Sequence, residues 1–273
     1  MEKLATMEWL SSYCLTEPQC GSDAAALTTR AEKRGDRYVL DGVKQFISGA
    51  GASDFYFVFA RTSDEGARGI SAFAIEKDAP GLGFGANERK MGWNAQPTRQ
   101  VILENCEVPA ENLIGREGEG FRFAMSGLDG GRINIGACSL GGAWAALDKT
   151  REYLFERKAF GRELAAFQAM QFKIADMASD LDAGRLMIWR AADALDRADP
   201  NATRHSAMAK RYATDLGFEI CNQALQAHGG YGYLKDYGLE KLVRDVRVHQ
   251  ILEGTNEIMR VVVSRSVLGG NRG

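Results

Sequence analysis

The segment from Ala165 to Ala198, AAFQAMQFKIADMASDLDAGRLMIWRAADALDRA, contains no proline and repeats apolar side chains at helical spacing. Those apolar positions are Met170, Ile174, Met177, Leu181, Ile188 and Leu195. This period predicts one long amphipathic helix, which Pro200 ends. Proline-free stretches at 121–155, 204–227 and 257–268 predict three further helices. Long helices joined by short loops can bury their apolar faces only against one another, so these residues predict an antiparallel four-helix bundle.

Four glycines lie inside the expected helices, at Gly136, Gly141, Gly142 and Gly184. A glycine in a helix interior costs up to about 1 kcal/mol relative to alanine. We therefore expect these positions to be places where two helices, or a helix and a ligand, pack closely.

The first 109 residues follow a different pattern, in which short apolar runs alternate with turn residues. Four of the five prolines fall here. Arg37–Leu40, Asp41-Gly42 and Val43–Ser48 predict a β-hairpin with a two-residue Asp-Gly turn. Further strands are expected at 54–61, 69–76 and 98–105, and a loop is expected at 81–85. These residues predict a small all-β domain, so the whole chain is expected to be an α+β protein with two domains.

The composition restricts the class of protein. The chain has 273 residues, of which 45% are hydrophobic and 26% charged, and its formal net charge is −2. No long run of one charge sign supports binding to nucleic acid or to a membrane surface, and no apolar stretch approaches the ~20 residues of a membrane span. The five cysteines show neither metal-ligand nor disulfide spacing, so we expect no metal site and a reducing compartment. No signal or transit sequence is apparent, which predicts a cytoplasmic location, or the mitochondrial matrix in a eukaryote.

Two common nucleotide-binding motifs are not found. No Gly-x-Gly-x-x-Gly follows a strand in a βαβ unit, and no Gly-Lys-Ser/Thr loop follows a strand. A redox cofactor would have to be held in some other way.

The stretch His249–Arg260, HQILEGTNEIMR, sets a carboxylate in an apolar run directly before a glycine. Glu253 follows two large aliphatic residues at an expected loop-to-helix junction, where desolvation would raise its pKa and make it a stronger base. Gly254 would let a ligand approach the backbone, and Thr255 is the expected N-cap. The alternative is that Glu253 is only a first-turn acid that pairs with the helix dipole.

Two other stretches suit a flat ligand. Tyr13-Cys14-Leu15-Thr16-Glu17-Pro18 leads to Gly21-Ser22-Asp23, a polar turn with glycine and proline. Lys44–Gly51 is a strand that ends in a glycine-rich bend, and Phe46 and Ser48 point to the same face of it. Each pattern alone is also typical of an ordinary turn or strand end.

Together these blocks resemble the acyl-CoA dehydrogenase family, the FAD enzymes that introduce an α,β double bond into acyl-CoA thioesters. Five blocks in order carry the resemblance: 13–23, 46–48, RKAFG at 157–161, QAHGGYG at 226–232 and 252–260. Within the family, the stretches MGWNAQPTR at 91–99 and LDGGRIN at 128–134 look most like the isobutyryl-CoA dehydrogenase branch.

The resemblance implies a domain plan and a set of binding residues. A small antiparallel β-barrel domain would span 1–117, and the four-helix bundle would span 118–273. The implied FAD-binding residues are Tyr13, Cys14, Leu15, Thr16, Gly21, Ser22, Phe46, Ile47, Ser48, Arg157, Phe167, Gln168, Gln226, Ala227, His228, Gly229, Gly230, Thr255, Asn256 and Glu257. The implied residues of the thioester-CoA tunnel are Ser22, Asp129, Gly130, Gly131, Arg132 and Arg265.

Glu253 falls on the family's catalytic base. One subgroup, the isovaleryl-CoA type, places its base at the position that is Gly131 here, and glycine cannot accept a proton. The resemblance therefore implies that Glu253 removes the α-proton, and Arg132 is expected to orient or tune its carboxylate. For Arg132 the alternative is an ordinary salt bridge within the bundle. Glu257, one helical turn later, is expected to be a capping acid rather than a second catalyst.

The implied activity is dehydrogenation of isobutyryl-CoA to methacrylyl-CoA, as in valine catabolism, with electron-transfer flavoprotein as the electron acceptor. In the family the FAD site is shared between subunits, which implies a homo-oligomer, a dimer or a dimer of dimers. Other short substrates, 2-methylbutyryl-CoA or butyryl-CoA, are the alternatives.

The chain also departs from the family pattern. The family's N-terminal helical domain is expected to be absent, because the chain begins only twelve residues before Tyr13. A weakly active or inactive remnant that acts as a folded oligomeric binding protein is therefore the second reading. Gln19-Cys20 replaces the usual small pair, and we expect an altered flavin contact if position 19 needs a positive φ.

Overall fold

A computed structural model describes residues 2–269, and it divides the chain into two compact units. Unit 1 contains the residues up to Lys90 together with Asn94–Gly127, and unit 2 contains Met91–Trp93 together with the residues from Leu128 onward. The α+β class expected from the sequence is confirmed. Among the described residues, no helix combines the length and the apolarity that a membrane span needs.

Unit 1 is built on one eight-stranded sheet, preceded by the short helix α1 (Glu2–Ala5). Its strands are β1 (Ser11–Cys14), β2 (Arg30–Arg34), β3 (Arg37–Ser48), β4 (Phe55–Arg61), β5 (Ile70–Glu76), β6 (Leu82–Phe84), β7 (Thr98–Pro109) and β8 (Leu113–Ile114). The strands pair in the order β6-β7-β3-β2-β4-β5-β8, and β1 pairs with β4. Most pairs are antiparallel, but β1 and β2 each run parallel to β4. Tyr38, Tyr56 and Phe73 are the largest apolar side chains fully buried between these strands.

Two local predictions for unit 1 are wrong. Asp41-Gly42 is not a turn, because β3 continues through it and pairs with β7 on both sides of an irregularity at Leu40/Gly42. The hairpin turn lies earlier, between the paired residues Arg34 and Arg37. Gly42 is needed for close packing, since a Cβ there would stand 2.8 Å from the Cα of Thr29. The expected loop at 81–85 contains β6, which pairs with β7.

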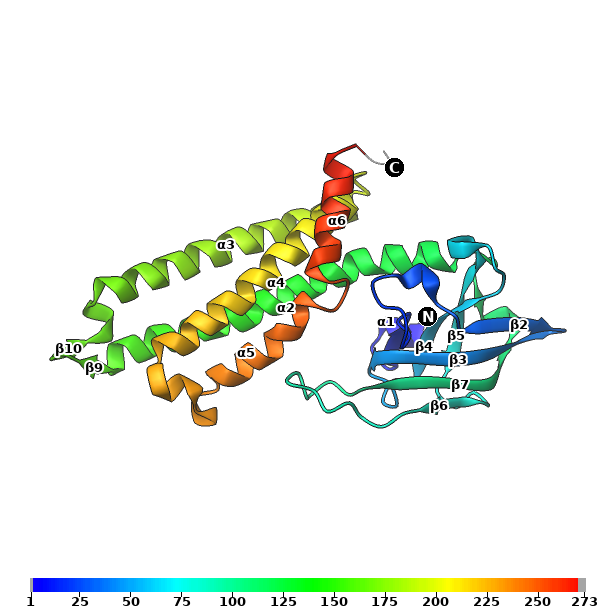
Figure 1. Cartoon of the computed structure of the whole chain (residues 1–273), viewed down its shortest axis with the longest axis horizontal. Coiled ribbons are helices and arrows are strands. Elements are labelled where there is room, and N and C mark those ends of the chain that lie inside the picture. The colour runs from blue at the N-terminus through cyan, green and yellow to red at the C-terminus, as the bar shows by residue number, and fades with distance from the viewer. Residues whose placement is uncertain (1, 270–273) are drawn as a thin grey trace. The chain divides into compact units, whose positions relative to one another are not determined.

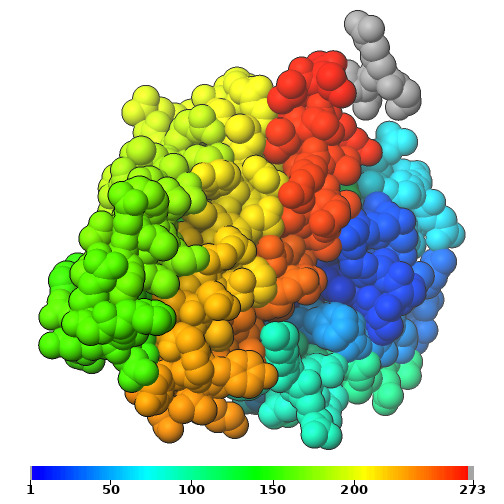
Figure 2. Space-filling view, turned by 60° about the vertical axis from the view of Figure 1, so that its left-hand side comes forward, coloured from blue at the N-terminus to red at the C-terminus, as the bar shows by residue number. Residues whose placement is uncertain are grey.

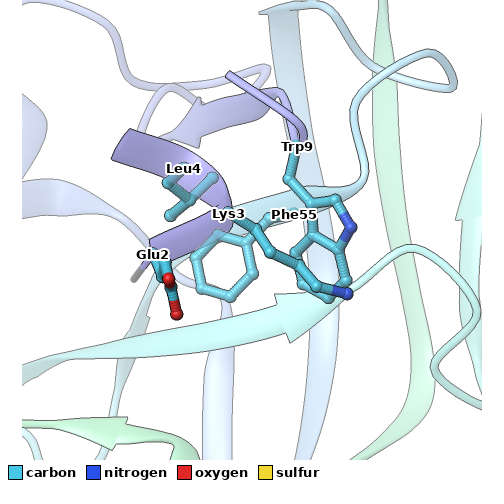
Figure 3. Close-up of a pocket in the computed structure, with 5 residues that line it drawn as sticks. All are labelled: Glu2, Lys3, Leu4, Trp9 and Phe55. Carbon is cyan, nitrogen blue, oxygen red and sulfur yellow. The ribbon is translucent and has the colours of Figure 1, made fainter. Parts of the chain in front are cut away.

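The first residues of unit 1 form a shallow hollow on the sheet (Figure 3). It is lined by Glu2, Lys3, Leu4, Trp9 and Phe55. The ammonium group of Lys3 lies 4.4 Å from the centre of the Trp9 ring, a cation–π contact that covers the indole.

Unit 2 is helical. Its helices are α2 (Gly120–Glu156, whose first residues group with unit 1), α3 (Gln168–Asp196), α4 (Ala202–Ala227), α5 (Leu239–Arg247) and α6 (Asn256–Val267). A two-stranded hairpin, β9 (Lys158–Ala159) and β10 (Arg162–Glu163), joins α2 to α3. The long helices α3 and α4 run side by side (Figure 1), and α6 packs against α4 (Figure 2). The four helices expected from the sequence are therefore confirmed.

The apolar core of unit 2 explains this packing and corrects one expectation. Met177 and Leu181 of α3 meet Ile220 of α4 in a buried cluster, to which α5 adds Leu239 and Val246. The sequence did not predict α5, so the helix count of four was too low. The apolar residues Leu239, Leu242, Val243 and Val246 do recur at helical spacing in LEKLVRDVR, but the segment has only nine residues.

The helix glycines mostly lie where helices touch. An added Cβ at Gly142 would stand 2.9 Å from Val246, and one at Gly184 would stand 3.0 Å from Leu140. Gly136 packs in the same way against Ile188. Gly141 is the exception, because nothing lies within 4 Å of its Cβ position. The prediction of close packing holds for three of the four positions.

Candidate active site

Glu253 lies in the loop that precedes α6, in a conformation that few side chains adopt. Its φ is +55°, and that of the next residue, Gly254, is +87°. Burial raises the pKa of the Glu253 carboxyl, while the positive charges of Arg132 and Lys210 act in the opposite direction. The expected desolvated carboxylate at a loop-to-helix junction is therefore confirmed. A raised pKa makes the deprotonated carboxylate a stronger base, which is what a general base at neutral pH requires.

The carboxylate of Glu253 occupies the space next to Gly131 of α2. A Cβ built on Gly131 would overlap the Glu253 Oε2 atom and would stand 2.9 Å from its Cδ. Any side chain at position 131 would thus displace the carboxylate. A carboxylate carried by a side chain at position 131 would therefore lie close to where the Glu253 carboxylate lies. The resemblance to the family implies the same, because the isovaleryl-CoA subgroup has its base at position 131.

Arg132 connects α2 to the Glu253 loop. Its Nε donates a hydrogen bond to the backbone carbonyl of Glu253 at 3.4 Å, and its Nη1 lies 2.8 Å from Asp129 Oδ1. Asp129 accepts a second hydrogen bond from Thr203 Oγ1 of α4. Arg132 therefore forms the bundle salt bridge and also holds the backbone of the Glu253 loop, and its expected role towards the carboxylate stays a prediction.

Lys210 of α4 approaches the same loop from the other side. Its side chain is 0% exposed, and Nζ donates to the carbonyl of Gly254 at 2.7 Å and to Asn256 Oδ1 at 2.9 Å. Asn256 in turn donates through Nδ2 to Thr214 and to Asp215. Sequence reasoning did not single out Lys210, because a lone lysine in a polar helical stretch is normally solvated.

The start of α6 is formed as expected. The Thr255 side chain accepts a hydrogen bond from the backbone N–H of Ile258 at 3.3 Å, so the prediction of an N-cap at Thr255 is confirmed. Asn256 is buried and its amide is held by internal hydrogen bonds. Glu257 and Arg265 are exposed on α6, and their expected ligand roles stay predictions.

A second group of expected site residues lines a hollow of about 420 Å³ at the far end of α4. Its lining residues are Tyr153, Arg157, Leu164, Met170, Gln226, Ala227, His228, Gly229, Gly230, Tyr231 and Leu234. The His228 ring stacks on Tyr153 at 4.2 Å, and burial lowers the pKa of this imidazole, so His228 is neutral near pH 7. Phe167 directly precedes α3, and Gln168, the first residue of that helix, is exposed.

The expected flavin residues of unit 1 lie on β1, β3 and the loop after β1. Phe46 has a φ of +58° and is 64% exposed; Ser48 is also exposed, whereas Ile47 between them is buried. Both residues are accessible, and their expected common face stays a prediction, because β3 is irregular between Lys44 and Ile47. The carbonyl of Thr16 accepts a hydrogen bond from the N–H of Gln45 at 2.8 Å, which ties the turn to β3. Gln19 does not have a positive φ, so the strain considered for this position does not arise.

A buried ion pair supports that turn. Lys44 Nζ lies 2.8 Å from Glu17 Oε1 and also donates to the carbonyl of Leu15 at 3.3 Å. Both charged side chains are nearly inaccessible to solvent. Glu17 accepts further hydrogen bonds from Thr28 and Thr29. The pair thus holds both neighbours of Thr16 in place, a role that the sequence did not reveal.

The expected site residues therefore form three groups. Glu253 lies with Gly131, Arg132 and Asp129 in unit 2, the residues around His228 form a hollow in the same unit, and those around Thr16 and Phe46 belong to unit 1. Within the described residues, no group of three metal-ligating side chains comes together.

Comparison with known proteins places this arrangement in a family. The models named acyl-CoA dehydrogenase, middle domain, and acyl-CoA dehydrogenase, C-terminal domain, match residues 12–106 and 118–268. The mitochondrial isobutyryl-CoA dehydrogenases of Bos taurus and Dictyostelium discoideum are 57% and 54% identical over 97% and 98% of this chain. The structure of butyryl-CoA dehydrogenase from Megasphaera elsdenii is 41% identical, with a TM-score of 0.96 over 97% of this chain and 70% of that one.

These matches define the class of protein by its two domains, which correspond to the middle and C-terminal domains of an acyl-CoA dehydrogenase. The chain belongs to the acyl-CoA dehydrogenase family, whose members depend on FAD, so the expected family and its cofactor are confirmed. The chain spans 64% of the length of the two isobutyryl-CoA dehydrogenases that it matches.

Proposed function

We propose that this chain is an FAD-dependent acyl-CoA dehydrogenase that converts isobutyryl-CoA to methacrylyl-CoA, with Glu253 as the base that removes the α-proton. The observation that carries the proposal is the partly buried Glu253 carboxylate, which has a raised pKa and lies against a glycine that leaves room for it. The identity to isobutyryl-CoA dehydrogenases supports the choice of substrate.

Removal of an α-proton from a thioester requires a strong base and stabilisation of the enolate oxygen. Burial makes the Glu253 carboxylate more basic than an exposed glutamate. Its loop is held from α2 by Arg132 and from α4 by Lys210, so the carboxylate keeps one position while charge develops on the substrate. The backbone N–H of Glu253 is the donor that we propose for the thioester oxygen.

The residues present fit FAD. The hollow around His228 offers stacked rings, the exposed Gly229 and Gly230, and the Arg157 guanidinium, which suit the aromatic and phosphate parts of a dinucleotide. The exposed Phe46 and Ser48 with the Thr16 turn suit the flavin ring, and the N-terminus of α6 at Thr255 suits a phosphate. When bound, FAD supplies the acceptor for the hydride that leaves Cβ of the substrate.

We assign the acyl-CoA contacts to Ser22, Gly130, Gly131 and Arg265. Gly130 has nothing within 4 Å of its Cβ position, and Ser22 and Arg265 are exposed. Asp129 and Arg132 were expected to contact the acyl-CoA as well. They form a buried ion pair, and we propose that this pair supports the binding surface from the interior of the unit.

Partners and assembly follow from the proposed activity. Arg157, Gln168 and Gln226 are exposed in the single chain, so they are accessible to an FAD or a subunit that reaches them from outside. We propose a homo-oligomer, a dimer or a dimer of dimers, and electron-transfer flavoprotein as the electron acceptor. The functional domains would be 1–117 and 118–273.

A second candidate is a dehydrogenase for another short acyl-CoA, and the likeness to butyryl-CoA dehydrogenase favours it. Anaerobic bleaching of the bound flavin by a panel of thioesters separates the two. Isobutyryl-CoA should bleach faster than butyryl-CoA or 2-methylbutyryl-CoA. A folded protein that binds no flavin would instead support the reading as a binding protein.

The catalytic assignment is tested by two matched variants. Glu253→Gln keeps the shape and the backbone donor but cannot accept the proton, so bleaching by isobutyryl-CoA should slow at least about 10²–10⁴-fold while FAD stays bound. Glu257→Gln removes an exposed carboxylate one helical turn away and should leave the bleaching rate nearly unchanged. If Glu257→Gln is the inactive variant and Glu253→Gln still bleaches, the base is wrongly assigned.

A further inference from the structure

The buried side chain of Lys210 is not one of the reacting groups described above, yet it reaches the loop that carries Glu253. Placing a lysine ammonium group in the protein interior is unfavourable unless specific partners compensate for the lost hydration. Lys210 is 0% exposed, and both of its hydrogen-bond acceptors belong to the segment Gly254–Asn256. The lysine therefore stabilises this loop at the expense of its own solvation.

The two acceptors are placed to fix the backbone next to the base. The carbonyl of Gly254, 2.7 Å from Nζ, belongs to the residue directly after Glu253. The carbonyl of Glu253 itself is held by Arg132 from α2. Two cations on two helices thus clamp two successive carbonyl groups, in a segment where both residues have positive φ.

The second acceptor, Asn256 Oδ1, is oriented by its own neighbours. Its Nδ2 donates to Thr214 Oγ1 at 2.9 Å and to Asp215 Oδ1 at 2.7 Å. These acceptors leave only the amide oxygen to face Lys210, at 2.9 Å. The amide is therefore fixed in one orientation, and Lys210 has a partner that cannot rotate away.

We propose that Lys210 is a positioning residue, whose ammonium group holds the Glu253–Asn256 loop in its left-handed conformation and balances the charge of the Glu253 carboxylate. This inference rests on the proposed function of Glu253 as the base. Loss of the cation would let the loop relax and would remove a positive charge that lowers the pKa of the Glu253 carboxyl.

The charges around Lys210 are consistent with this role. Burial lowers the pKa of Lys210 to about 8, against the opposing effect of Asp215 on the same helix, Glu253 in the loop and Glu257 on α6. Arg132 on α2 lowers this pKa further. His249 also faces Lys210, but burial lowers the pKa of His249 to about 4, so it is neutral above pH 7.

The experiment measures the Glu253 carboxyl directly. The full chain is labelled with ¹³C at the glutamate side-chain carboxyl, and the Glu253 resonance is assigned by its loss in Glu253→Gln. In Lys210→Gln, which keeps a polar group but no charge, the pKa of Glu253 should rise by about one unit. Lys210→Arg, which keeps the cation, should restore a value near that of the wild type. The matched control is Lys33→Gln, which removes an exposed lysine of β2 and should change nothing.

The rate of flavin bleaching by isobutyryl-CoA is measured on the same variants. In Lys210→Gln it should fall roughly 10- to 100-fold at saturating substrate, because a displaced base loses alignment, while half-saturation changes little. An unchanged pKa of Glu253 in Lys210→Gln, or an unchanged bleaching rate, would overturn the proposal.

One further measurement keeps the outcome decisive. Should Lys210→Gln fail to fold, the wild-type chain is titrated between pH 7 and pH 9, where the Glu253 resonance should show a step near pH 8 as Lys210 loses its proton; no step would reject the role. The ¹³C titration requires no catalysis. Persistent bleaching in Glu253→Gln therefore refutes the proposed function alone, and an unaltered titration in Lys210→Gln refutes this inference alone.

Discussion

Glu253 keeps its carboxylate in a backbone conformation that is strained for any residue except glycine. A non-glycine residue at positive φ costs on the order of 1–3 kcal/mol and persists only where the surroundings determine it. Here the φ is +55°, and the surroundings are the carbonyl clamps from Arg132 and Lys210. The strain has a functional explanation, because this backbone conformation places the Glu253 carboxylate against Gly131.

At the residue scale, Gly131 offers a sharp test of this geometry. Gly131→Ala adds a Cβ that overlaps the Glu253 carboxylate, so the base must move. The bleaching rate should fall roughly 10- to 100-fold, since a misplacement near 1 Å can cost about 10²-fold. Alanine favours a helix by up to about 1 kcal/mol over glycine, which should offset part of the steric cost to stability.

Gly141→Ala is the matched control for this substitution. Gly141 lies in the same helix, is exposed, and has nothing within 4 Å of its Cβ position. Alanine there should stabilise the protein by up to about 1 kcal/mol in urea unfolding and leave bleaching unchanged. Equal loss of activity in both variants would show that the effect belongs to the helix and not to the base.

The difference between Glu253 and Lys210 shows what the sequence can predict about a site. Glu253 was predicted because apolar neighbours and a following glycine are local signals of a desolvated carboxyl. Lys210 was missed because its partners, Gly254 and Asn256, lie more than forty residues away in the chain. Only the packing of α6 on α4 brings them together, so no local pattern around Lys210 indicates burial.

At the scale of elements, the buried pair Glu17–Lys44 joins the turn after β1 to β3. Glu17→Gln would leave the Lys44 ammonium buried without a counter-charge, and breaking one half of such a pair typically costs about 3–5 kcal/mol. Urea unfolding should show this loss. The double variant Glu17→Gln, Lys44→Met should be less destabilised than Glu17→Gln alone; equal destabilisation would mean that the pair does not act as a unit.

The same pair predicts how stability depends on acid. Burial alone raises the pKa of Glu17, but the charge and hydrogen bond of Lys44, with the donors of Thr28 and Thr29, outweigh it and lower the pKa to about 2. Glu17 binds its proton more weakly in the folded chain than in the unfolded one. Its contribution is therefore complete above pH 4.5 and is lost as the pH falls towards 2.

This acid effect is measured as a difference between two proteins. Unfolding free energies of the wild type and of Glu17→Gln are compared from pH 6 to pH 2. The gap should close by up to about 3 kcal/mol over the lower part of this range, because the protonated Glu17 no longer stabilises Lys44. A constant gap would exclude Glu17 as the group that titrates.

The elements themselves were predicted unevenly, for physical reasons. The long helices α2, α3 and α4 were predicted because proline-free apolar periods over many residues leave little choice. The Asp41-Gly42 turn was wrong, since pairing of β3 with β7 on both sides of Gly42 overrides a local turn signal. Helix α5 was missed because it has only nine residues, although Leu239, Leu242, Val243 and Val246 recur at helical spacing and meet the α3–α4 core.

At the scale of the whole molecule, each unit has its own apolar core, and the expected FAD residues are divided between the units. Unit 2 also exposes large aromatic side chains where the chain turns between helices. Phe155 is 61% exposed, Phe160 of the β9–β10 turn is 95% exposed, and Tyr233 after α4 is 80% exposed. Exposed apolar side chains of this size are candidates for contact with a partner.

We expect a second copy of this chain to cover that surface, so that self-association and FAD binding depend on each other. Phe160→Asp places a charge on the most exposed aromatic residue and should shift the protein towards a monomer while lowering the FAD content. Sedimentation velocity and the flavin absorbance of the same sample measure both. Val267→Asp, at an exposed apolar position near the end of α6, is the control and should change neither. A monomeric Phe160→Asp protein that retains one FAD per chain would show that the cofactor site is complete within one chain.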